Sequence, residues 1–271
     1  MLARDVLRIL SGRHEVVAVT HAELDIDNEK QTADFLCTSR PDVVINCAAY
    51  TNVDGCETDS ARAFSVNAGG VRHLACACRK AGAKLFHLST DYVFDGASPG
   101  PYTEDDAPNP LSVYGQSKLA GEQYIRDILS SYVIIRTEWL YGSQGTHFVG
   151  KIAELSRERD VLQVVNDQLG SPTWTKDLGR AIEALLRIPS QGIYNITNTG
   201  ACTWFDFARK IISCAGSPVR IEPISSMQLN RLAKRPANSV LNCTKFIRET
   251  GHILRTWECA LEEYMKEIWI E

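Results

Sequence analysis

The sequence predicts an α/β protein built on a doubly wound parallel sheet. Short apolar runs rich in β-branched residues alternate with stretches of helical periodicity, as is typical of parallel strands covered by helices on both faces. The chain has 271 residues, 44% hydrophobic and 23% charged, which is enough for one large domain or for a main domain with a smaller annex.

The strands are predicted from apolar runs such as DVVINC and YVIIRT. In chain order they are Glu15–Thr20, Asp42–Cys47, Lys84–Ser89, Tyr132–Thr137 and Gly192–Ile196. The predicted helices are Met1–Leu10, Asn28–Ser39, Ala61–Ala81, Val113–Leu129, Phe148–Glu158, Thr175–Arg187, Trp204–Ala215, Met227–Ala233 and Ala260–Ile268. Pro41 ends the helix before the second strand, because the residue that precedes a proline avoids the helical conformation.

The regular alternation fades after about Tyr141, where loops such as NDQLGSPTW replace it. We therefore expect a nucleotide-binding part over residues 1–143 and a mainly substrate-binding part over residues 144–271. A segment near residues 175–200 is expected to return to the sheet, because the last predicted strand lies there.

Charge and cysteine content exclude several classes of partner. The net charge is −4 and the pI about 5.9, so we expect no nucleic-acid or membrane partner. Nine cysteines, an odd number without a CxxC pair, argue against a disulfide framework and against zinc. The first residues, MLARDVLRIL, are not a signal peptide, and no apolar run reaches the ~18 residues of a membrane span. A cytoplasmic protein is expected.

Chemistry-bearing residues gather after the third predicted strand. The run KLFHLS leads directly into Thr90 and Asp91, and ligands of open α/β sheets collect at the carboxyl ends of strands. Tyr114 and Lys118 lie one turn apart on one face of the helix that follows. Taken alone, each is also compatible with an ordinary turn or with a surface helix. Their order along the chain favours an acid–base site.

Such a trio suits the reduction of a carbonyl group. A free tyrosine has a pKa near 10, and a lysine cation close by favours the phenolate and moves that pKa toward neutrality. The tyrosine then delivers a proton to the carbonyl oxygen while a hydride reaches the carbon. A neighbouring hydroxyl holds the oxygen in line.

Five motifs resemble, in order and spacing, those of the RmlD-like proteins. They are STDYVFDG (89–96), VYGQSKLAGE (113–122), RTEWLYG (136–142), NDQLGSPT (166–173) and RPANSVLN (235–242), and PDVVINCAAYTNVDGCE (41–57) is similar as well. These proteins are the dTDP-4-dehydrorhamnose reductases, within the extended short-chain dehydrogenase/reductases. The resemblance implies a Rossmann-like fold and NADPH- or NADH-dependent reduction of the 4-keto group of dTDP-4-dehydro-L-rhamnose.

The resemblance also implies roles for particular residues. The catalytic residues would be Tyr114, Lys118 and Thr90, with Lys118 also holding the nicotinamide ribose. The cofactor would be lined by Asp25, Ile26, Ala48, Ala49 and Tyr50, together with Tyr114 and Lys118. The sugar nucleotide would contact Thr90, Asp91, Trp139 and Arg235. Trp139 as a core aromatic and Arg235 as a solvated loop residue stay open as alternatives.

One feature departs from the family pattern. The chain begins inside what resembles the first helix, so the first strand and the glycine-rich loop that would receive the pyrophosphate are expected to be absent. An N-terminally truncated sheet that binds dinucleotide poorly is the corresponding expectation. The alternative function is a non-catalytic regulatory subunit on the same fold that binds a sugar nucleotide or a nucleotide. A homodimer is common among such relatives, and we assign no metal site.

Overall fold

A parallel sheet of four strands forms the centre of the molecule. The computed structural model describes residues 1–269, with side chains up to residue 267. The strands lie in the order β1-β2-β3-β8, and each pairs in parallel with its neighbour. Their bounds are β1 Val43–Asn46, β2 Lys84–Thr90, β3 Tyr132–Thr137 and β8 Gly192–Asn195. These strands confirm the predicted parallel α/β sheet.

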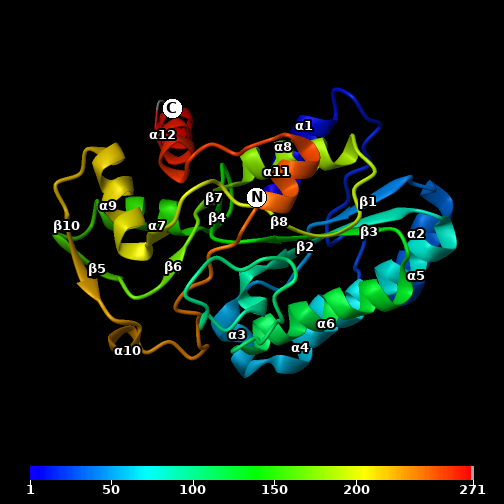
Figure 1. Cartoon of the computed structure of the whole chain (residues 1–271), viewed down its shortest axis with the longest axis horizontal. Coiled ribbons are helices and arrows are strands. Elements are labelled where there is room, and N and C mark those ends of the chain that lie inside the picture. The colour runs from blue at the N-terminus through cyan, green and yellow to red at the C-terminus, as the bar shows by residue number, and fades with distance from the viewer. Residues whose placement is uncertain (270–271) are drawn as a thin grey trace.

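Helices cover both faces of this sheet (Figure 1). One face carries α2 (Glu29–Ser39), α5 (Val71–Ala81) and α6 (Val113–Ile128). The other carries α1 (Leu2–Leu10), α8 (Thr175–Leu186) and α11 (Thr244–Thr250). Each face has its own apolar core, because β2 and β3 direct alternate side chains to opposite faces. Phe86 and Val133 lie in one core, and Leu85 and Ile134 in the other.

The strand predicted at Glu15–Thr20 is not formed, and that prediction was wrong. Residues 15–20 belong to no helix or strand, and Val17 and Val19 are 67% and 41% exposed. A strand exists only where a neighbouring strand accepts its backbone hydrogen bonds, and within residues 1–269 β1 pairs only with β2. The apolar run at residues 15–20 therefore has no partner strand within residues 1–269.

The helix predicted at Ala61–Ala81 is one continuous helical segment with an irregular turn. It comprises α4 (Ser60–Phe64), a π-helical turn η1 (Ser65–Gly70) and α5. A short helix that the sequence did not predict, α3 (Val53–Thr58), precedes it. π-helical turns inside helices frequently mark functional sites, and this one carries Asn67.

Much of the rest of the chain forms a third apolar core. It lies between α7 (Phe148–Leu155), α9 (Trp204–Ala215) and α12 (Trp257–Trp269). Short strand pairs join these helices: β5 (Val161–Val165) with β10 (Arg220–Ile224), β4 (Leu140–Tyr141) with β7 (Thr173–Trp174), and β6 (Leu169–Gly170) with β9 (Cys202–Thr203). The helix predicted at Met227–Ala233 is only α10 (Ser226–Leu229), because Asn230 turns left-handed with a φ of 47°.

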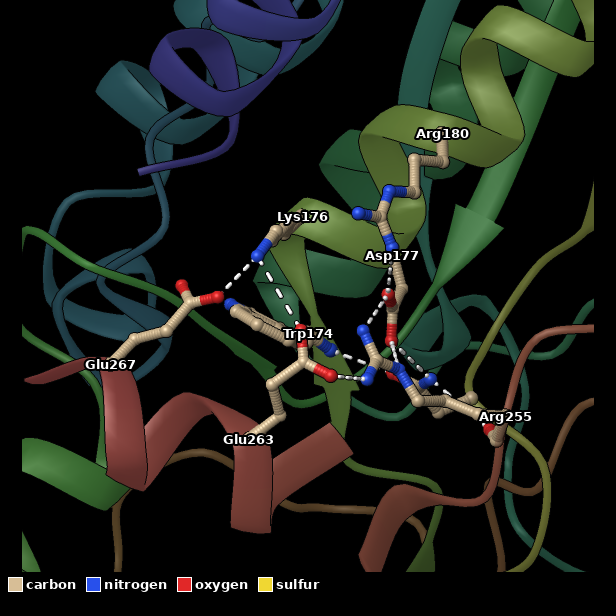
Figure 2. Close-up of polar contacts among 8 residues, drawn as sticks. Trp174, Lys176, Asp177, Arg180, Arg255, Glu263 and Glu267 are labelled. Atoms are coloured by element: carbon tan, nitrogen blue, oxygen red, sulfur yellow. Dashed lines mark hydrogen bonds and ion pairs between the residues drawn. The ribbon is translucent and has the colours of Figure 1, made fainter. Parts of the chain in front are cut away.

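Charged side chains hold α12 against α8 (Figure 2). Arg255 donates from Nε and Nη2 to the carboxylate of Asp177, at 2.9 and 2.8 Å, and also pairs with Glu263. Lys176 bridges Glu263 and Glu267 on α12. The Asp177 carboxylate is buried, so its bidentate arginine partner supplies the charge compensation that burial requires. No helix in the described range is long and apolar enough to cross a membrane.

Candidate active site

The centre of the site is the carboxyl end of β2. Thr90 is the last residue of this strand, and Asp91 begins the 3-10 turn η2 (Asp91–Val93). Both side chains are buried. The Thr90 hydroxyl donates to Asp91 Oδ1 at 2.9 Å and accepts from the backbone N–H of Tyr92 at 3.1 Å. The threonine is thus held in one orientation at the edge where ligands of such sheets bind.

The first turn of α6 brings Tyr114 against this strand end. Ser112 caps the helix by accepting from the backbone N–H of Gly115 at 3.2 Å. A Cβ on Gly115 would lie 2.2 Å from the Tyr92 carbonyl oxygen, so only glycine lets the helix approach the η2 turn this closely. The Tyr92 and Tyr114 rings meet edge to face at 5.6 Å, and the Tyr114 hydroxyl lies near that of Thr90. Burial raises the pKa of Tyr114, and the hydrogen bond with Thr90 partly offsets this rise.

Lys118 is buried and turned toward β2. Its Nζ donates to the Leu88 carbonyl at 2.6 Å and lies 3.2 Å from Nε2 of His87. Burial lowers the pKa of Lys118 to about 8. We expected the Lys118 cation to lower the pKa of Tyr114. Instead, the polar contacts described for Lys118 are with β2, and the pKa of Tyr114 is raised.

A buried ion pair fixes the rest of α6 to the sheet. Arg136 donates from Nε and Nη2 to the two Glu122 oxygens at 3.0 and 2.7 Å, and both side chains are almost completely buried. The Ser89 hydroxyl donates to the same carboxylate. The helix that carries Tyr114 and Lys118 is therefore tied to β2 and β3 by a rigid two-point contact.

The loop after β1 brings three predicted cofactor residues together. Ala48 is exposed, while Ala49 and Tyr50 are half-buried. Asn46 accepts from the backbone N–H of Ala48 at 3.0 Å, and Asn67 both accepts from and donates to the Tyr50 backbone, at 2.8 and 3.0 Å. The loop backbone is thus fixed at both ends.

Asn67 is a positioning residue outside the set of site residues predicted from the sequence. From η1 it also donates to the Ser117 hydroxyl at 3.0 Å, so it connects the loop after β1 to the helix of Tyr114. The sequence signal was an asparagine beside paired glycines, in SVNAGG. His87, beside Lys118, and the buried Glu138 were also missed, because a histidine inside a strand and a glutamate after one have no local signature.

The predicted residues Asp25 and Ile26 lie beside the same π-helical turn. Ile26 is buried, and a Cβ on Gly70 would lie 2.7 Å from its side chain. The Ile26 carbonyl contacts His73 Nδ1 at 3.1 Å. Asp25 accepts from the backbone N–H of Asp27 at 3.0 Å, and its side chain is 44% exposed.

Trp139 adopts an unusual backbone conformation. Its φ is 48°, which bulky residues rarely adopt, and its ring stacks on Trp204 with centroids 3.5 Å apart. The residue is half-buried and packs against the third apolar core, between α7, α9 and α12. Trp139 therefore lies near the strand ends, as a substrate contact requires, and it also packs partly as a core aromatic.

Arg235 is not a solvated loop residue. It forms a two-point ion pair with Asp54 of α3, at 3.3 and 3.2 Å, and hydrogen-bonds Tyr92. Its side chain is 18% exposed. The arginine therefore reaches the same neighbourhood as Thr90 and Asp91, with its charge already compensated by Asp54. Among the described residues, no cluster of three or more His, Cys, Asp or Glu side chains is arranged to hold a metal ion.

A family model described as the RmlD substrate binding domain matches residues 1–270. The chain belongs to this family. Among curated RmlD-like relatives, a dTDP-4-dehydrorhamnose reductase from Streptomyces griseus is 42% identical, over 97% of this chain and 89% of its own length. A dTDP-4-keto-6-deoxy-D-glucose reductase from Streptomyces niveus is 40% identical, over 97% of this chain and 92% of its own.

Solved structures agree with this assignment. The dTDP-4-dehydrorhamnose reductase from Bacillus anthracis, crystallised in complex with NADP, superimposes with a TM-score of 0.95 at 38% identity. The match covers 98% of this chain and 95% of that protein. The Rossmann-like α/β fold of the extended short-chain dehydrogenase/reductases, expected from the motifs, is confirmed.

Proposed function

We propose that this protein catalyses the NADPH- or NADH-dependent reduction of the 4-keto group of dTDP-4-dehydro-L-rhamnose to dTDP-L-rhamnose. The observation that carries the proposal is the Thr90–Tyr114 hydroxyl pair at the carboxyl end of β2, in a chain of the RmlD family. Relatives of about 40% identity are named as 4-ketoreductases of dTDP-6-deoxysugars. Their names support the reductase over the alternative, a non-catalytic regulatory subunit.

In this proposal the proton comes from Tyr114. A raised pKa keeps the phenol protonated at neutral pH, so it acts as a general acid toward the ketone oxygen. Thr90, fixed by its bonds to Asp91 and Tyr92, orients that oxygen. Lys118, with a pKa of about 8, is still largely cationic at neutral pH, and in this proposal it holds the nicotinamide ribose from its place beside Leu88 and His87.

The residues around the loop after β1 fit a dinucleotide. Ala48 and Ala49 offer small side chains at a strand end, and Asn46 and Asn67 hold the loop backbone in place. We propose that Asp25, Ile26, Ala48, Ala49 and Tyr50 line this cofactor, with Tyr114 and Lys118 at its reactive end. The bound nicotinamide supplies the hydride. The NADP complex of the Bacillus anthracis reductase supports NADPH as one of the two reductants.

On the substrate side we propose contacts from Thr90, Asp91, Trp139 and Arg235. The guanidinium of Arg235 suits the diphosphate oxygens once it exchanges its partner Asp54. We further propose that residues 1–143 bind mainly the cofactor and residues 144–271 mainly the sugar nucleotide. The segment near residues 175–200, which contains β8, returns to the sheet of the cofactor-binding part.

The assembly and compartment are part of the same proposal. We propose a homodimer in the cytoplasm. All nine cysteines are free thiols, as in a reducing compartment. Light scattering coupled to gel filtration measures the mass in solution, and a monomeric mass at assay concentrations contradicts the dimer.

The reaction is tested by incubating the protein with dTDP-4-dehydro-L-rhamnose and either NADPH or NADH. We expect consumption of the reduced cofactor matched by formation of dTDP-L-rhamnose, identified by NMR. Calorimetric titration with dTDP is run in parallel. Tight binding of dTDP without turnover favours the regulatory subunit instead, and the absence of both contradicts a sugar-nucleotide site.

A further inference from the structure

Asp91 and Glu138 occupy matching positions at the ends of two neighbouring strands. Thr90 and Thr137 are register partners in the β2–β3 pair, and the next residues are the two acids. Each of these acids is only 2% exposed. Among the described ion pairs, none involves either carboxyl group. Two acidic side chains thus share one buried neighbourhood without a cation.

Such a pair holds one proton at neutral pH. Two carboxyl groups close together in a low-dielectric environment resist double ionisation. Burial raises the pKa of Asp91 to about 6, and burial together with the charge of Asp91 raises the pKa of Glu138 well above its ordinary value. The Ser239 hydroxyl donates to Glu138 Oε2 at 3.0 Å. With one proton between them, the two carboxyl groups form one acceptor carboxylate and one donor carboxylic acid.

Each acid has one oxygen left without a partner. Asp91 Oδ2, Glu138 Oε1 and the neighbouring Thr137 Oγ1 are buried and have no hydrogen-bond partner in the described part of the chain. Buried polar atoms are nearly always hydrogen-bonded, so these atoms point to a bound water or ligand group. The other oxygen of Asp91 receives the Thr90 hydroxyl, which also contacts Tyr114. The unpartnered oxygens therefore lie close to the proposed reacting ketone.

The surrounding backbone is shaped to hold Glu138 in this position. The next residue, Trp139, has the strained φ of 48°, and its stacking on Trp204 keeps the chain in that conformation. A Cβ on Gly170 would lie 2.5 Å from Glu138 Oε2, so glycine makes room for the carboxyl group. Strain of this kind is retained where the surroundings enforce it, and it concentrates at functional sites.

We propose that the Asp91–Glu138 pair recognises the hydroxyl group on the carbon next to the ketone. A hydroxyl group both donates and accepts, and this pair offers one carboxylate that accepts and one carboxylic acid that donates. The inference rests on the proposed function, in which the hydroxyl beside the 4-keto group is the one on C3. It adds that the site selects α-hydroxy ketones and that Glu138 determines this specificity.

The pair is also the element that makes recognition depend on pH. The titratable groups around Asp91 are Tyr92 and Tyr114, with the Arg235 cation beyond Tyr92. Around Glu138 they are the thiols of Cys202 and Cys243. Burial raises the pKa of all these phenols and thiols, so they stay neutral near pH 7. As the pH rises, loss of the shared proton removes the donor and places two negative charges on the pair, so hydroxyl recognition weakens.

Calorimetry with three probes tests this proposal: dTDP, dTDP-L-rhamnose and its 3-deoxy analogue, titrated from about pH 6 to about pH 9. For the unchanged protein we expect the 3-deoxy analogue to bind about tenfold or more weakly than dTDP-L-rhamnose at neutral pH, since a charged hydrogen bond is lost. This advantage should shrink at alkaline pH, while dTDP affinity changes much less.

Two variants separate recognition from a structural role. Glu138→Gln keeps a donor but cannot ionise, so this variant should still bind dTDP-L-rhamnose more tightly than the 3-deoxy analogue at alkaline pH. Glu138→Leu should bind the two sugar nucleotides equally at every pH. Glu104→Gln, at a partly buried carboxyl outside the pair, is the matched control and should keep the pH dependence. Equal affinity for the two sugars, or an unchanged alkaline loss in Glu138→Gln, overturns the inference. Failure to bind dTDP at all instead overturns the proposed function, and this inference with it.

Discussion

At the scale of single residues, the proposed reduction depends most on the hydroxyl of Tyr114. Tyr114→Phe should lower kcat for ketone reduction by about 10²–10⁴-fold, the usual contribution of a general acid. The ring stays against Tyr92, so the melting temperature should change little. Tyr124→Phe, on the exposed side of the same helix, is the control and should keep full activity. A Tyr114→Phe protein with near-normal kcat would remove this residue from the chemistry.

The burial of Lys118 predicts a pH dependence of stability. Its pKa is lowered from 10.5 to about 8 in the folded protein. Between these values the unfolded chain carries a proton that the folded chain has released, so this residue makes the free energy of unfolding rise with pH across that window. Lys118→Met should reduce the slope of the free energy of unfolding against pH by up to about 1.4 kcal/mol per pH unit. Urea unfolding from about pH 7.5 to about pH 10 measures it, and parallel curves for the two proteins would refute it.

At the scale of elements, α6 depends on its buried ion pair with β3. Glu122→Leu leaves the Arg136 guanidinium buried without a counter-charge, and we expect a loss of about 3–5 kcal/mol in the free energy of unfolding. The double variant with Arg136→Met should lose less, because no unpaired charge remains. Lys151→Ala breaks an exposed pair and should cost at most about 1 kcal/mol. Urea titrations decide, and equal losses for Glu122→Leu and Lys151→Ala would show that the buried pair does not anchor the helix.

At the scale of the whole molecule, Arg235 and Asp54 join the C-terminal segment to α3. If Arg235 takes the diphosphate, it has to release Asp54, so the two ligands compete for one guanidinium. Arg235→Met should weaken dTDP binding about tenfold to a hundredfold, the range expected for charged hydrogen bonds. Asp54→Asn should strengthen it, because the competitor loses its charge. Calorimetry measures both, with the more exposed Arg231→Met as control. An Arg235→Met protein that binds dTDP normally would assign the arginine a purely structural role.

Several predicted elements could be read from local patterns alone. Helices such as Trp204–Ala215 agree to the residue, because a capping threonine, helical periodicity and a closing glycine lie within one short stretch. The elements that were missed lack such signals. The strand β10 carries Pro223 and is mostly exposed, and β5 becomes a strand only by pairing with it.

The sequence by itself determined the class of fold and the family, and it proposed Thr90, Tyr114 and Lys118 for the candidate site, because alternation, capping and motif order are local properties of the chain. Only the tertiary structure decided that residues 15–20 form no strand, that Lys118 turns toward His87 and Leu88, and that Asp91 and Glu138 are both buried after neighbouring strand ends. Each of these outcomes depends on which distant segment lies alongside. Neighbours in space determine which strands pair, where a buried amine points and whether two acids share a proton. A local sequence pattern does not identify those neighbours.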